Sequence, residues 1–420
     1  MNTEEKLFEI LKKCQFKVSK DTREDLRGKA YFAIKGDSFD GNRFVDEALR
    51  KGAVIAVTDD IKKIGDNIYF VPNVLNTLQN LARKYRQTFQ IPILVIGGSN
   101  GKTTSKELVR DILKTKYKVC ATEGSLNNHL GVPLSIFSMN KKTQIGVFEI
   151  GANHPNEHIE LLNIINPTHV VVTNNGMDHL EGFGSPSGAR KANKEIYDWA
   201  LKNRVKVFVN KEHKDLMSDS KRNIRITYPE VNIKNTNQNP LTVVWKQKKY
   251  KTKMFGNYNI ENVLLSVSVG KNFGVTVEEA LKTICKYKPT SKRSQFLSKN
   301  KIKYIVDCYN ANPTSVSLSL QSFIKSTNGP RGVILGDMLE LGKYSASEHK
   351  KIASYVLKQK IDQVIFVGKN FKIAVGKTRK PHDWFPDSVS AKTWFDKQKF
   401  KSYTFLLKGS RGMKIEKIIE

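Results

Sequence analysis

The sequence predicts an α/β protein built from three consecutive α/β domains. Short apolar runs typical of buried parallel strands recur along the chain, and helical patterns separate them. Several of these runs end in polar, glycine-containing loops. The 420 residues suffice for two to three domains with separate cores. We predict boundaries near residues 90 and 297, giving domains of 1–90, 91–296 and 297–420.

The first predicted domain, 1–90, is a small α/β unit. Its first 20 residues are amphipathic and charged, which favours a helix. The run AVIAVTDD at 53–60 is typical of a strand. A further helix is expected from Leu75 to Tyr85, before the break at Pro92.

The second predicted domain has the pattern of a mainly parallel sheet. IPILVIGG at 91–98 is a continuous apolar run, as expected of a strand buried on both faces. It leads into a glycine-rich turn and a helical pattern at 98–117. Two further apolar strands are expected in IGVFEIGANHP at 145–155 and HVVVTNNG at 169–176. Open α/β sheets bind ligands at the carboxyl ends of such strands, so these loops are the candidate site.

The third predicted domain alternates strands and helices in a Rossmann-like manner. Its expected strands lie in KYIVDCYNANP, GVILGD, QVIFVG and YTFLLKGS. A helical pattern, SASEHKKIASYVLKQ, separates the second strand from the third.

The charge of +31 comes mostly from lysine, since 56 of the 71 basic residues are Lys and 15 are Arg. Phosphate recognition more often uses arginine, whose planar guanidinium binds phosphate through two hydrogen bonds. The lysines are also dispersed along the chain. The charge therefore favours a solvated surface over a nucleic-acid partner, while an anionic small substrate stays compatible.

Cysteine use and hydropathy indicate a cytoplasmic protein without membrane insertion. The four cysteines are scattered without a C-x-x-C pair, which argues against a disulfide framework or a zinc cluster. No run approaches the ~18 apolar residues of a membrane span. The first 20 residues also lack the apolar centre of a signal peptide. We expect a monomer.

A phosphate-binding loop is predicted where the strand at 91–98 runs into a helix. Converging backbone N–H groups and the helix N-terminus favour phosphate, Lys102 would reach the β- and γ-phosphates, and Thr103 would bind Mg²⁺. The strict G-x-x-x-x-G-K-[ST] pattern is not met, since its first glycine would fall at Ile96. The alternative is a glycine-rich turn without a ligand. The predicted ATP-binding residues of this loop are Gly98, Ser99, Asn100, Gly101, Lys102, Thr103 and Thr104.

Two later loops supply candidate metal ligands. Glu149 ends the strand in GVFEIG, where its carboxylate is a suitable oxygen ligand, or alternatively a solvated or helix-capping group. His179 lies in the polar loop TNNGMDHLEGFGS, although a single histidine is more often structural than a ligand. Their positions after consecutive strands favour a shared site with Thr103.

Together these motifs resemble the Mur ligases. GSNGKTT, FEIGANHPNE, TNNGMDHLEGFGS, GNYNIENVLLS, RSQ, DCYNANPTS, LGDMLELG and LLKGSRGM occur in the order of that family. DTREDLRGKAYFAIKGDSFDGNRF resembles its UDP-sugar-binding N-terminal domain. The resemblance implies an ATP-dependent amide ligase of peptidoglycan synthesis that uses Mg²⁺ and an acyl phosphate intermediate. Its implied small-molecule substrates are UDP-MurNAc-tripeptide and D-alanyl-D-alanine.

The resemblance also implies roles for individual residues. Catalysis is assigned to Lys102, Glu149, His179 and Arg293, and metal binding to Thr103, Glu149 and His179. Further ATP contacts are assigned to Asn259 and Asn262 in the adenine region, and to Arg293 and Asp307 at the phosphates and ribose. Substrate contacts are assigned to Thr22, Arg23, Asn127, Asn128, Asn310, Asn312, Lys408 and Arg411. The alternative for each asparagine is turn capping, and for Arg293 a surface ion pair.

The sequence departs from the family at two positions. An ungapped alignment places Asn193 where the family usually has a carbamylated lysine that helps hold a second Mg²⁺, with Lys191 and Lys194 nearby. Lys194 is displaced from that position by roughly 100° around the helix. Neither Asn193 nor Lys194 is therefore assigned as a metal ligand. Cys308 stands where the family tends to have Ser or Thr, and we expect a small, inert buried side chain there.

Three other functions remain open. A related ligase adds the third peptide residue, although the D-N-P-R-type signature expected of it is not evident here. A basic phosphate-loop ATPase that binds nucleic acid would show turnover stimulated by DNA or RNA. A relative that binds the nucleotide sugar without catalysis is suggested by Asn193 alone.

Overall fold

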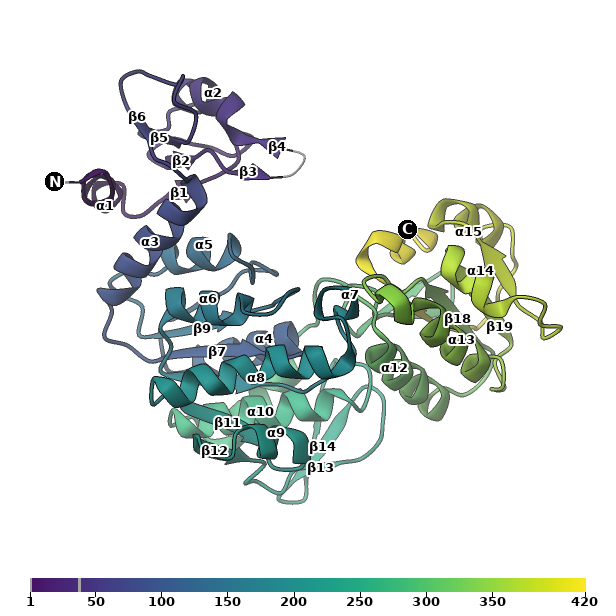
Figure 1. Ribbon diagram of the computed structural model, residues 1–420. Coiled ribbons are helices and arrows are strands. Elements are labelled where there is room, and N and C mark those ends of the chain that lie inside the picture. The colour runs from purple at the N-terminus through teal and green to yellow at the C-terminus, as the bar shows by residue number, and fades with distance from the viewer. Residues whose placement is uncertain (1, 37–38) are drawn as a thin grey trace. The chain divides into compact units, whose positions relative to one another are not determined.

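The computed structural model describes residues 2–36 and 39–420 and has a mixed α/β architecture with mainly parallel sheets (Figure 1), which confirms the predicted class. The strand orders of its larger sheets are β1-β2-β5-β6, β12-β11-β10-β7-β9-β8, β13-β14-β15 and β16-β17-β21-β18-β19-β20. None of the helices in the described ranges is long and apolar enough to cross a membrane.

The chain forms two compact units, which are not consecutive in sequence. One comprises the chain up to Val95, Tyr117–Gly151 and Glu157–His169, and the other comprises Ile96–Lys116, Ala152–Asn156 and Val170–Glu420. The division into three domains stays a prediction.

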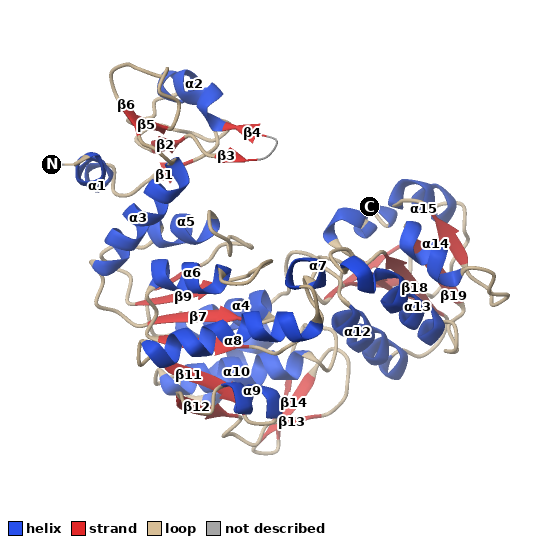
Figure 2. Cartoon of the chain, in the orientation of Figure 1, coloured by secondary structure: helices blue, strands red, loops and turns tan. Residues whose placement is uncertain are grey.

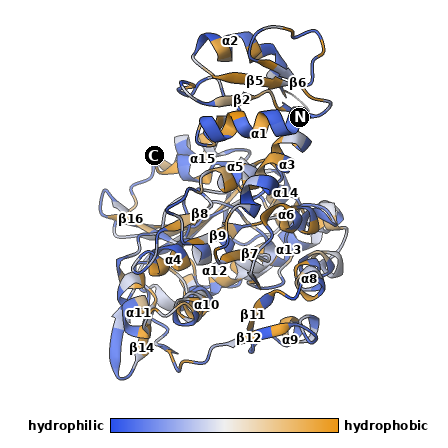
Figure 3. Ribbon diagram, turned by 90° about the vertical axis from the view of Figure 1, so that its left-hand side faces the viewer, coloured by the Kyte–Doolittle hydropathy of each residue, from blue (hydrophilic) through white to orange (hydrophobic). Residues whose placement is uncertain are grey.

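The N-terminal part of the first unit is a small sheet covered by helices. Its four strands are parallel, and Tyr31 on β2 is paired with Ala56 on β5. These two strands are largely hydrophobic (Figure 3), and both residues are fully buried. The elements are α1 (Thr3–Lys13), β1 (Val18–Ser19), β2 (Ala30–Phe32), β3 (Lys35–Gly36), β4 (Phe39–Asp40), η1 (Gly41–Phe44), α2 (Val45–Arg50), β5 (Ile55–Thr58) and β6 (Ile68–Phe70).

The rest of this unit packs helix α3 against α5 and α6. Tyr85 on α3 donates to the carbonyl of Met139 over 2.7 Å. The buried Arg86 donates to the carbonyl of Ile165 over 2.8 Å, so its polar group is satisfied inside the unit. The elements are α3 (Val74–Gln87), the start of β7 (Ile93–Gly97), β8 (Val119–Ala121), α5 (Gly131–Phe137), β9 (Ile145–Glu149) and α6 (Glu157–Ile165).

In the second unit, the helix that follows the phosphate loop packs along α10. Leu108 and Ile112 on that helix share a buried cluster with Val263 and Val267 on α10, which fixes the helix direction. The elements are α4 (Lys102–Leu113), β10 (His169–Val172), α7 (Leu180–Phe183), α8 (Pro186–Lys202), β11 (Lys206–Asn210), α9 (Lys214–Asp219), β12 (Ile224–Tyr228), β13 (Lys234–Asn235), β14 (Thr242–Trp245), β15 (Lys248–Lys251), α10 (Asn259–Asn272) and α11 (Val277–Lys286).

The C-terminal part of the second unit has the predicted Rossmann-like alternation of strands and helices (Figure 2). Only β16 runs antiparallel to its neighbour among the strand pairs described for this sheet. The elements are β16 (Gln295–Lys299), β17 (Ile302–Val306), α12 (Pro313–Ser326), β18 (Arg331–Gly336), η2 (Gly342–Tyr344), α13 (Ser345–Val356), β19 (Gln363–Val367), α14 (Lys369–Val375), β20 (Asp383–Phe385), α15 (Ser388–Phe395), β21 (Thr404–Lys408), η3 (Arg411–Met413) and η4 (Ile415–Ile418).

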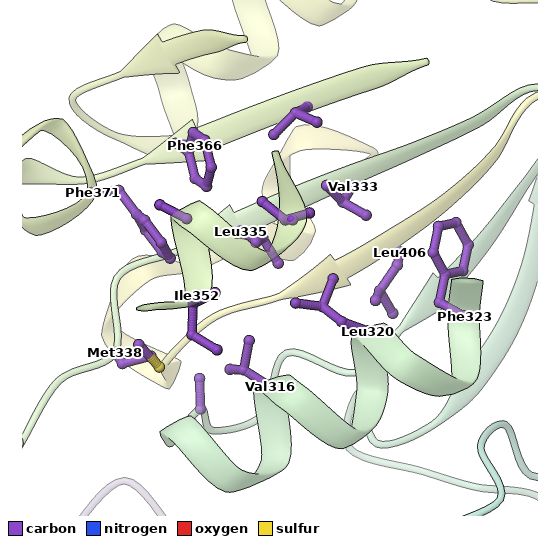
Figure 4. Close-up of a cluster of buried hydrophobic side chains, with 14 of the residues drawn as sticks. Val316, Leu320, Phe323, Val333, Leu335, Met338, Ile352, Phe366, Phe371 and Leu406 are labelled. Carbon is purple, nitrogen blue, oxygen red and sulfur yellow. The ribbon is translucent and has the colours of Figure 1, made fainter. Parts of the chain in front are cut away.

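A large apolar cluster lies between this sheet and helices α12 to α14 (Figure 4). Val333 and Leu335 on β18 and Phe366 on β19 contribute from the sheet, and Leu320 contributes from α12. Met338, in the loop after β18, belongs to the same cluster. This loop is therefore anchored to the core.

Candidate active site

The loop before α4 has a backbone that requires glycine. Gly98 and Gly101 have φ angles of +107° and +83°, in the left-handed region. A Cβ on Gly98 would lie 2.5 Å from Thr173 Oγ1, and one on Gly101 would collide with Asn262 Oδ1. Because side chains are excluded at both positions, neighbouring backbone and side chains can approach the loop closely.

Lys102 folds back over its own loop. Its Nζ donates to the carbonyls of Gly98 and Ser99 over 2.5 and 3.1 Å. The ammonium group therefore lies at the mouth of the loop, where a phosphate could replace the two carbonyls. Thr103, the next residue on α4, is buried.

The loop is tied to the residues that follow β10. The backbone N–H groups of Ser99 and Asn100 donate to the carbonyl and to the side-chain Oδ1 of Asn174, both over 3.0 Å. Asn100 Nδ2 is buried and has no hydrogen-bond partner among the described residues. A buried amide donor of this kind is costly unless an acceptor satisfies it, so it fits an anionic ligand in the loop.

Asn312 joins the loop to helix α12. Its Oδ1 accepts the backbone N–H of Ser315 over 2.8 Å, so it caps the helix as the alternative interpretation proposed. Its Nδ2 donates to Asn100 Oδ1 over 2.9 Å. Asn312 thus caps the helix and contacts the phosphate loop at the same time.

Ser99 belongs to a polar network that includes the departure at position 193. Its hydroxyl donates to Asp178 Oδ1 over 2.5 Å. The buried Asn193 on α8 donates from Nδ2 to Ser99 Oγ over 3.3 Å and to Asn175 Oδ1 over 3.0 Å. Lys194 forms a surface pair with Asp198 one helical turn away. Asn193 therefore faces the phosphate loop, and Lys194 does not take its place.

His179 is held by a glutamate from the C-terminal part of the unit. His179 Nδ1 and Glu340 Oε2 are 2.8 Å apart, and the Glu181 N–H donates to the Glu340 carbonyl over 3.0 Å. The hydrogen bond from His179 lowers the pKa of Glu340 and outweighs the effect of burial. Because Nδ1 is engaged, the ring can offer Nε2 to a metal ion.

Glu149 is described within the first unit. It is 1% exposed, at the end of β9, and its Oε1 accepts a hydrogen bond from Asn127 Nδ2 over 2.8 Å. Asn128 Oδ1 accepts the N–H of Gly131 over 2.9 Å at the start of α5. Asn127 therefore orients the predicted metal ligand, and Asn128 satisfies a backbone N–H at the first residue of α5.

The predicted adenine contacts are buried amides on α10. Asn259 and Asn262 are 2% and 7% exposed, and Asn262 Nδ2 donates to Asn259 Oδ1 over 2.8 Å. Asn262 Oδ1 accepts from Ser105 Oγ on α4 over 2.9 Å, and Asn259 Nδ2 donates to the Phe255 carbonyl over 2.7 Å. Asn262 thus joins α4 to α10, and Asn259 supports Asn262 from the same helix. Their contact with adenine stays a prediction.

Asp307 and Lys408 form a buried ion pair. Lys408 Nζ and Asp307 Oδ2 are 2.9 Å apart, and Tyr258 and the Ser294 N–H also donate to the carboxylate. Burial raises the pKa of Asp307, but Lys408 and these donors lower it overall. In this structure the two charged groups are bonded to each other, and the ATP role of Asp307 and the substrate role of Lys408 stay predictions.

Arg293 and Arg411 both lie over the ring of Tyr309. Their guanidinium carbons are 3.7 and 5.4 Å from the ring centroid. Arg293 Nε is buried without a hydrogen-bond partner among the described residues, and Arg411 is exposed. Two positive charges thus converge at the loop after β17, next to the exposed Asn310, which suits an anionic ligand.

The N-terminal substrate candidates lie in the first unit. The carbonyl of Thr22 accepts a hydrogen bond from Lys51 Nζ over 2.7 Å. Arg23 is exposed and pairs with Asp21 over 2.6 Å, and this bond holds the pKa of Asp21 well below its ordinary value. Their contact with a substrate stays a prediction.

The predicted metal ligands suit Mg²⁺ by their chemistry. Thr103, Glu149 and His179 offer a hydroxyl, a carboxylate and an imidazole, of which the oxygen donors are those that Mg²⁺ prefers. Across residues 2–36 and 39–420, no three His, Cys, Asp or Glu side chains are grouped to hold a metal. Of the predicted ligands, only Glu149 and His179 are of these types, because Thr103 offers a hydroxyl. The predicted set therefore stays a prediction.

Sequence reasoning missed three neighbours of the site: Asp178, Tyr309 and Glu340. Each lies inside a quoted motif, TNNGMDHLEGFGS, DCYNANPTS or LGDMLELG, but its partner is distant in the chain. Cys308 is buried, as expected. Burial and Glu416 raise the pKa of its thiol to about 12.

Two family descriptions match the chain. Residues 96–270 match the Mur ligase middle domain, and residues 292–387 match the Mur ligase glutamate ligase domain. A UDP-N-acetylmuramoyl-tripeptide–D-alanyl-D-alanine ligase of Bacillus subtilis is 30% identical over 96% of this chain and 92% of its own length. The protein of the same name from Haemophilus influenzae is 29% identical over the same shares.

Solved structures agree with these relatives. MurF from Acinetobacter baumannii has a TM-score of 0.85 and 25% identity over 98% of this chain and 97% of its own. MurF from Thermotoga maritima, solved with ADP, has a TM-score of 0.80 and 26% identity, with 96% of each chain covered. A 2,6-diaminopimelate ligase, at 16% identity and a TM-score of 0.52, is similar in fold. The chain therefore belongs to the Mur ligases, and within them to the UDP-N-acetylmuramoyl-tripeptide–D-alanyl-D-alanine ligase (MurF) family.

Proposed function

We propose that this protein joins D-alanyl-D-alanine to UDP-MurNAc-tripeptide in a reaction driven by ATP, forming the UDP-MurNAc-pentapeptide precursor of peptidoglycan. The observation that carries the proposal is the similarity to MurF ligases, which reaches 30% identity and extends over nearly the whole chain. The glycine-dependent phosphate loop, with Lys102 at its mouth, supports the use of ATP.

The reaction has two steps. An oxygen of the tripeptide carboxylate attacks the γ-phosphorus of ATP, so that ADP leaves and an acyl phosphate forms. The neutral amine of D-alanyl-D-alanine then attacks the acyl carbon, inorganic phosphate leaves, and the amine loses a proton as the amide forms. The protein contributes mainly by holding the reactants together and by neutralising charge.

Residues of this chain are assigned as follows. Lys102 would exchange its two loop carbonyls for phosphate oxygens, and the N–H groups at the start of α4 would face the same phosphates. Asn100 Nδ2 would gain the acceptor that it lacks. Arg293 and Arg411, over Tyr309, would bind further anionic groups of the substrates.

We assign Mg²⁺ to Thr103, Glu149 and His179. The ion would neutralise charge on the phosphates during transfer. Asn193 carries no negative charge, so we do not assign a second Mg²⁺ site to α8. The remaining ATP and substrate contacts are proposed as the family resemblance implies them.

We further propose a division into three domains. Domain 1–90 binds the UDP-sugar, domain 91–296 binds ATP, and domain 297–420 completes the ligase site. A cytoplasmic monomer fits the four free thiols and the small-molecule substrates.

The proposal is tested by incubating the protein with ATP, Mg²⁺, UDP-MurNAc-tripeptide and D-alanyl-D-alanine. We expect phosphate release that requires both peptide substrates, and a product whose mass equals that of the pentapeptide precursor. If the folded protein binds ATP but releases no phosphate above background, the ligase proposal is wrong. Release that requires a free diamino acid with UDP-MurNAc-dipeptide would favour the related third-residue ligase, and stimulation by DNA or RNA would favour the nucleic-acid alternative.

A further inference from the structure

The loop that carries His179 is bonded to the loop after β18 through both side chain and backbone. His179 Nδ1 lies 2.8 Å from Glu340 Oε2. Two residues further along, the N–H of Glu181 donates to the carbonyl of Glu340 over 3.0 Å. Glu340 therefore contacts the predicted metal-ligand loop at two points. These two contacts restrict the position and the orientation of the Glu340 side chain relative to His179.

The backbone of both loops is shaped for this contact. His179 and Glu340 have φ angles of +47° and +64°, a conformation that non-glycine residues adopt only at a cost. A Cβ on Gly342 would lie 3.2 Å from the Cα of Glu181, so glycine permits the close approach. Leu180 is buried in the same apolar cluster as Met338, which secures the pairing of the two loops (Figure 4 shows the cluster around Met338).

The loop after β18 is itself firmly supported. The carboxylate of Asp337 accepts the N–H groups of Asn370 and Phe371 over 2.9 and 3.0 Å. The N–H of Met338 donates to His349 Nε2 over 3.0 Å. These hydrogen bonds hold the backbone just before Glu340 in place.

The contact with Glu340 favours one of the two neutral tautomers of the His179 imidazole. A neutral imidazole has one N–H group and one nitrogen with a free lone pair, and only the second nitrogen can bind a metal. A carboxylate that accepts at Nδ1 keeps the proton there and leaves the lone pair on Nε2. We propose that Glu340 is a positioning residue that fixes His179 as the Nδ1–H tautomer, with Nε2 available to a divalent cation.

The inference rests on the proposed function, in which His179 binds Mg²⁺, and it adds a dependence on the C-terminal part of the chain. The residue that prepares the ligand comes from the loop after β18, whereas the ligand follows β10. The metal site is then complete only when these two loops are paired.

The first test is a spectroscopic one on the full chain without metal. In ¹⁵N-histidine-labelled protein near pH 8, the His179 signals are identified by their loss in His179→Gln. We expect one protonated nitrogen, Nδ1, in the wild type. In Glu340→Ala the proton should shift wholly or partly to Nε2. Glu340→Gln should retain the Nδ1–H tautomer, since its amide oxygen can still accept.

The second test measures Mn²⁺ as a probe of the cation site in the presence of ADP, by electron paramagnetic resonance. We expect Glu340→Ala to weaken Mn²⁺ binding by roughly 10- to 100-fold, and Glu340→Gln to weaken it less. Glu181→Ala is the matched control, because Glu181 is exposed and contacts Glu340 through its backbone. It should leave both the tautomer and the Mn²⁺ affinity unchanged.

The inference is wrong if His179 carries protons on both nitrogens in the wild type, which would make the contact an ion pair. It is also wrong if Glu340→Ala leaves the tautomer and the Mn²⁺ affinity unchanged. A wild type that makes no pentapeptide product contradicts the proposed function instead, whatever the tautomer. Unfolding temperatures of the variants, compared with that of the wild type, separate a local effect from loss of fold.

Discussion

At the scale of single residues, the hydrogen bonds of each charged group indicate what it can do. Lys102 Nζ donates to two loop carbonyls, and no carboxylate among the described residues forms an ion pair with it. Lys408 Nζ is bonded to the buried Asp307. The first ammonium group is therefore available to a phosphate, whereas the second is already paired with a buried carboxylate.

Lys102→Ala should lower the rate of phosphate release by at least about 100-fold, because the variant lacks a positive charge placed against the transferred phosphoryl group. Steady-state phosphate release measures the effect, and circular dichroism checks the fold. Lys194→Ala removes a lysine whose partner is the surface residue Asp198, and it should retain full activity. Equal activity in both variants would remove the phosphate-loop assignment.

Asn193→Leu should destabilise the protein by about 1–3 kcal/mol, because Asn175 Oδ1 loses the donor that satisfies it. It should also raise KM for ATP, since Asn193 holds Ser99 in the phosphate loop. Urea unfolding and steady-state kinetics measure the two effects. Lys191→Leu, at an exposed position on the same helix, is the control and should change neither quantity measurably.

At the scale of elements, the phosphate loop depends on the close approach of its neighbours. Gly98→Ala should weaken nucleotide binding at least tenfold, since its Cβ would lie 2.5 Å from Thr173 Oγ1 and 2.6 Å from the Thr173 nitrogen. Gly329→Ala is the matched control, because Gly329 also has a positive φ, of +82°, but open space around its Cβ position. It should cost about 1 kcal/mol in stability and leave nucleotide affinity unchanged. Calorimetric titration with ADP measures both variants.

Strands β17 and β21 are joined at their carboxyl ends by the ion pair of Asp307 and Lys408. Since the pKa of Asp307 is lowered in the folded state, the pair contributes stability that is fully present above the unfolded-state pKa, about 3.9. That contribution is lost as the pH falls through the lower, folded-state pKa. Asp307→Asn should lower the free energy of unfolding at pH 7 by about 3–5 kcal/mol, because Lys408 is left buried without its partner.

Urea unfolding at pH values between 2 and 7 checks this prediction. The loss of stability on acidification should be smaller in Asp307→Asn than in the wild type. Asp307→Asn combined with Lys408→Met should recover part of the stability at pH 7, since no buried charge remains unpaired. An identical pH profile in wild type and Asp307→Asn would contradict the assignment.

At the scale of the whole molecule, the charge of +31 predicts a dependence on salt. Only a few of the basic residues, chiefly Lys102 and Arg293, have a proposed role toward ATP, and the others mainly repel one another at the surface. Because salt screens this repulsion, the unfolding temperature should rise as NaCl increases from about 20 to about 300 mM. Thermal unfolding followed by circular dichroism measures the shift. A partly succinylated sample, whose net charge is negative and smaller in magnitude than 31, should show a smaller rise in unfolding temperature. A fall in the unfolding temperature of the unmodified protein with added NaCl would contradict the prediction.

The sequence alone determined the fold class and the family, and it located the candidate phosphate loop, because these depend on local pattern. Apolar runs followed by glycine-containing loops indicate parallel strands and their ligand-binding ends wherever they occur. Motifs such as GSNGKTT and LGDMLELG are contiguous, so they are visible without a structure. Local pattern also identified Asn193 as a departure from the family.

Only the tertiary structure decided which side chains meet. It brought Glu340 to His179, Asn312 to Asn100, and Asn193 to Ser99. The members of each pair are far apart in the chain, whereas helix and strand periodicity relates only residues that are close in sequence. The physical reason is that these contacts arise where the ends of strands and helices from different segments pack on a shared core. A hydrogen bond depends on distance and angle in space, which spacing along the chain does not specify.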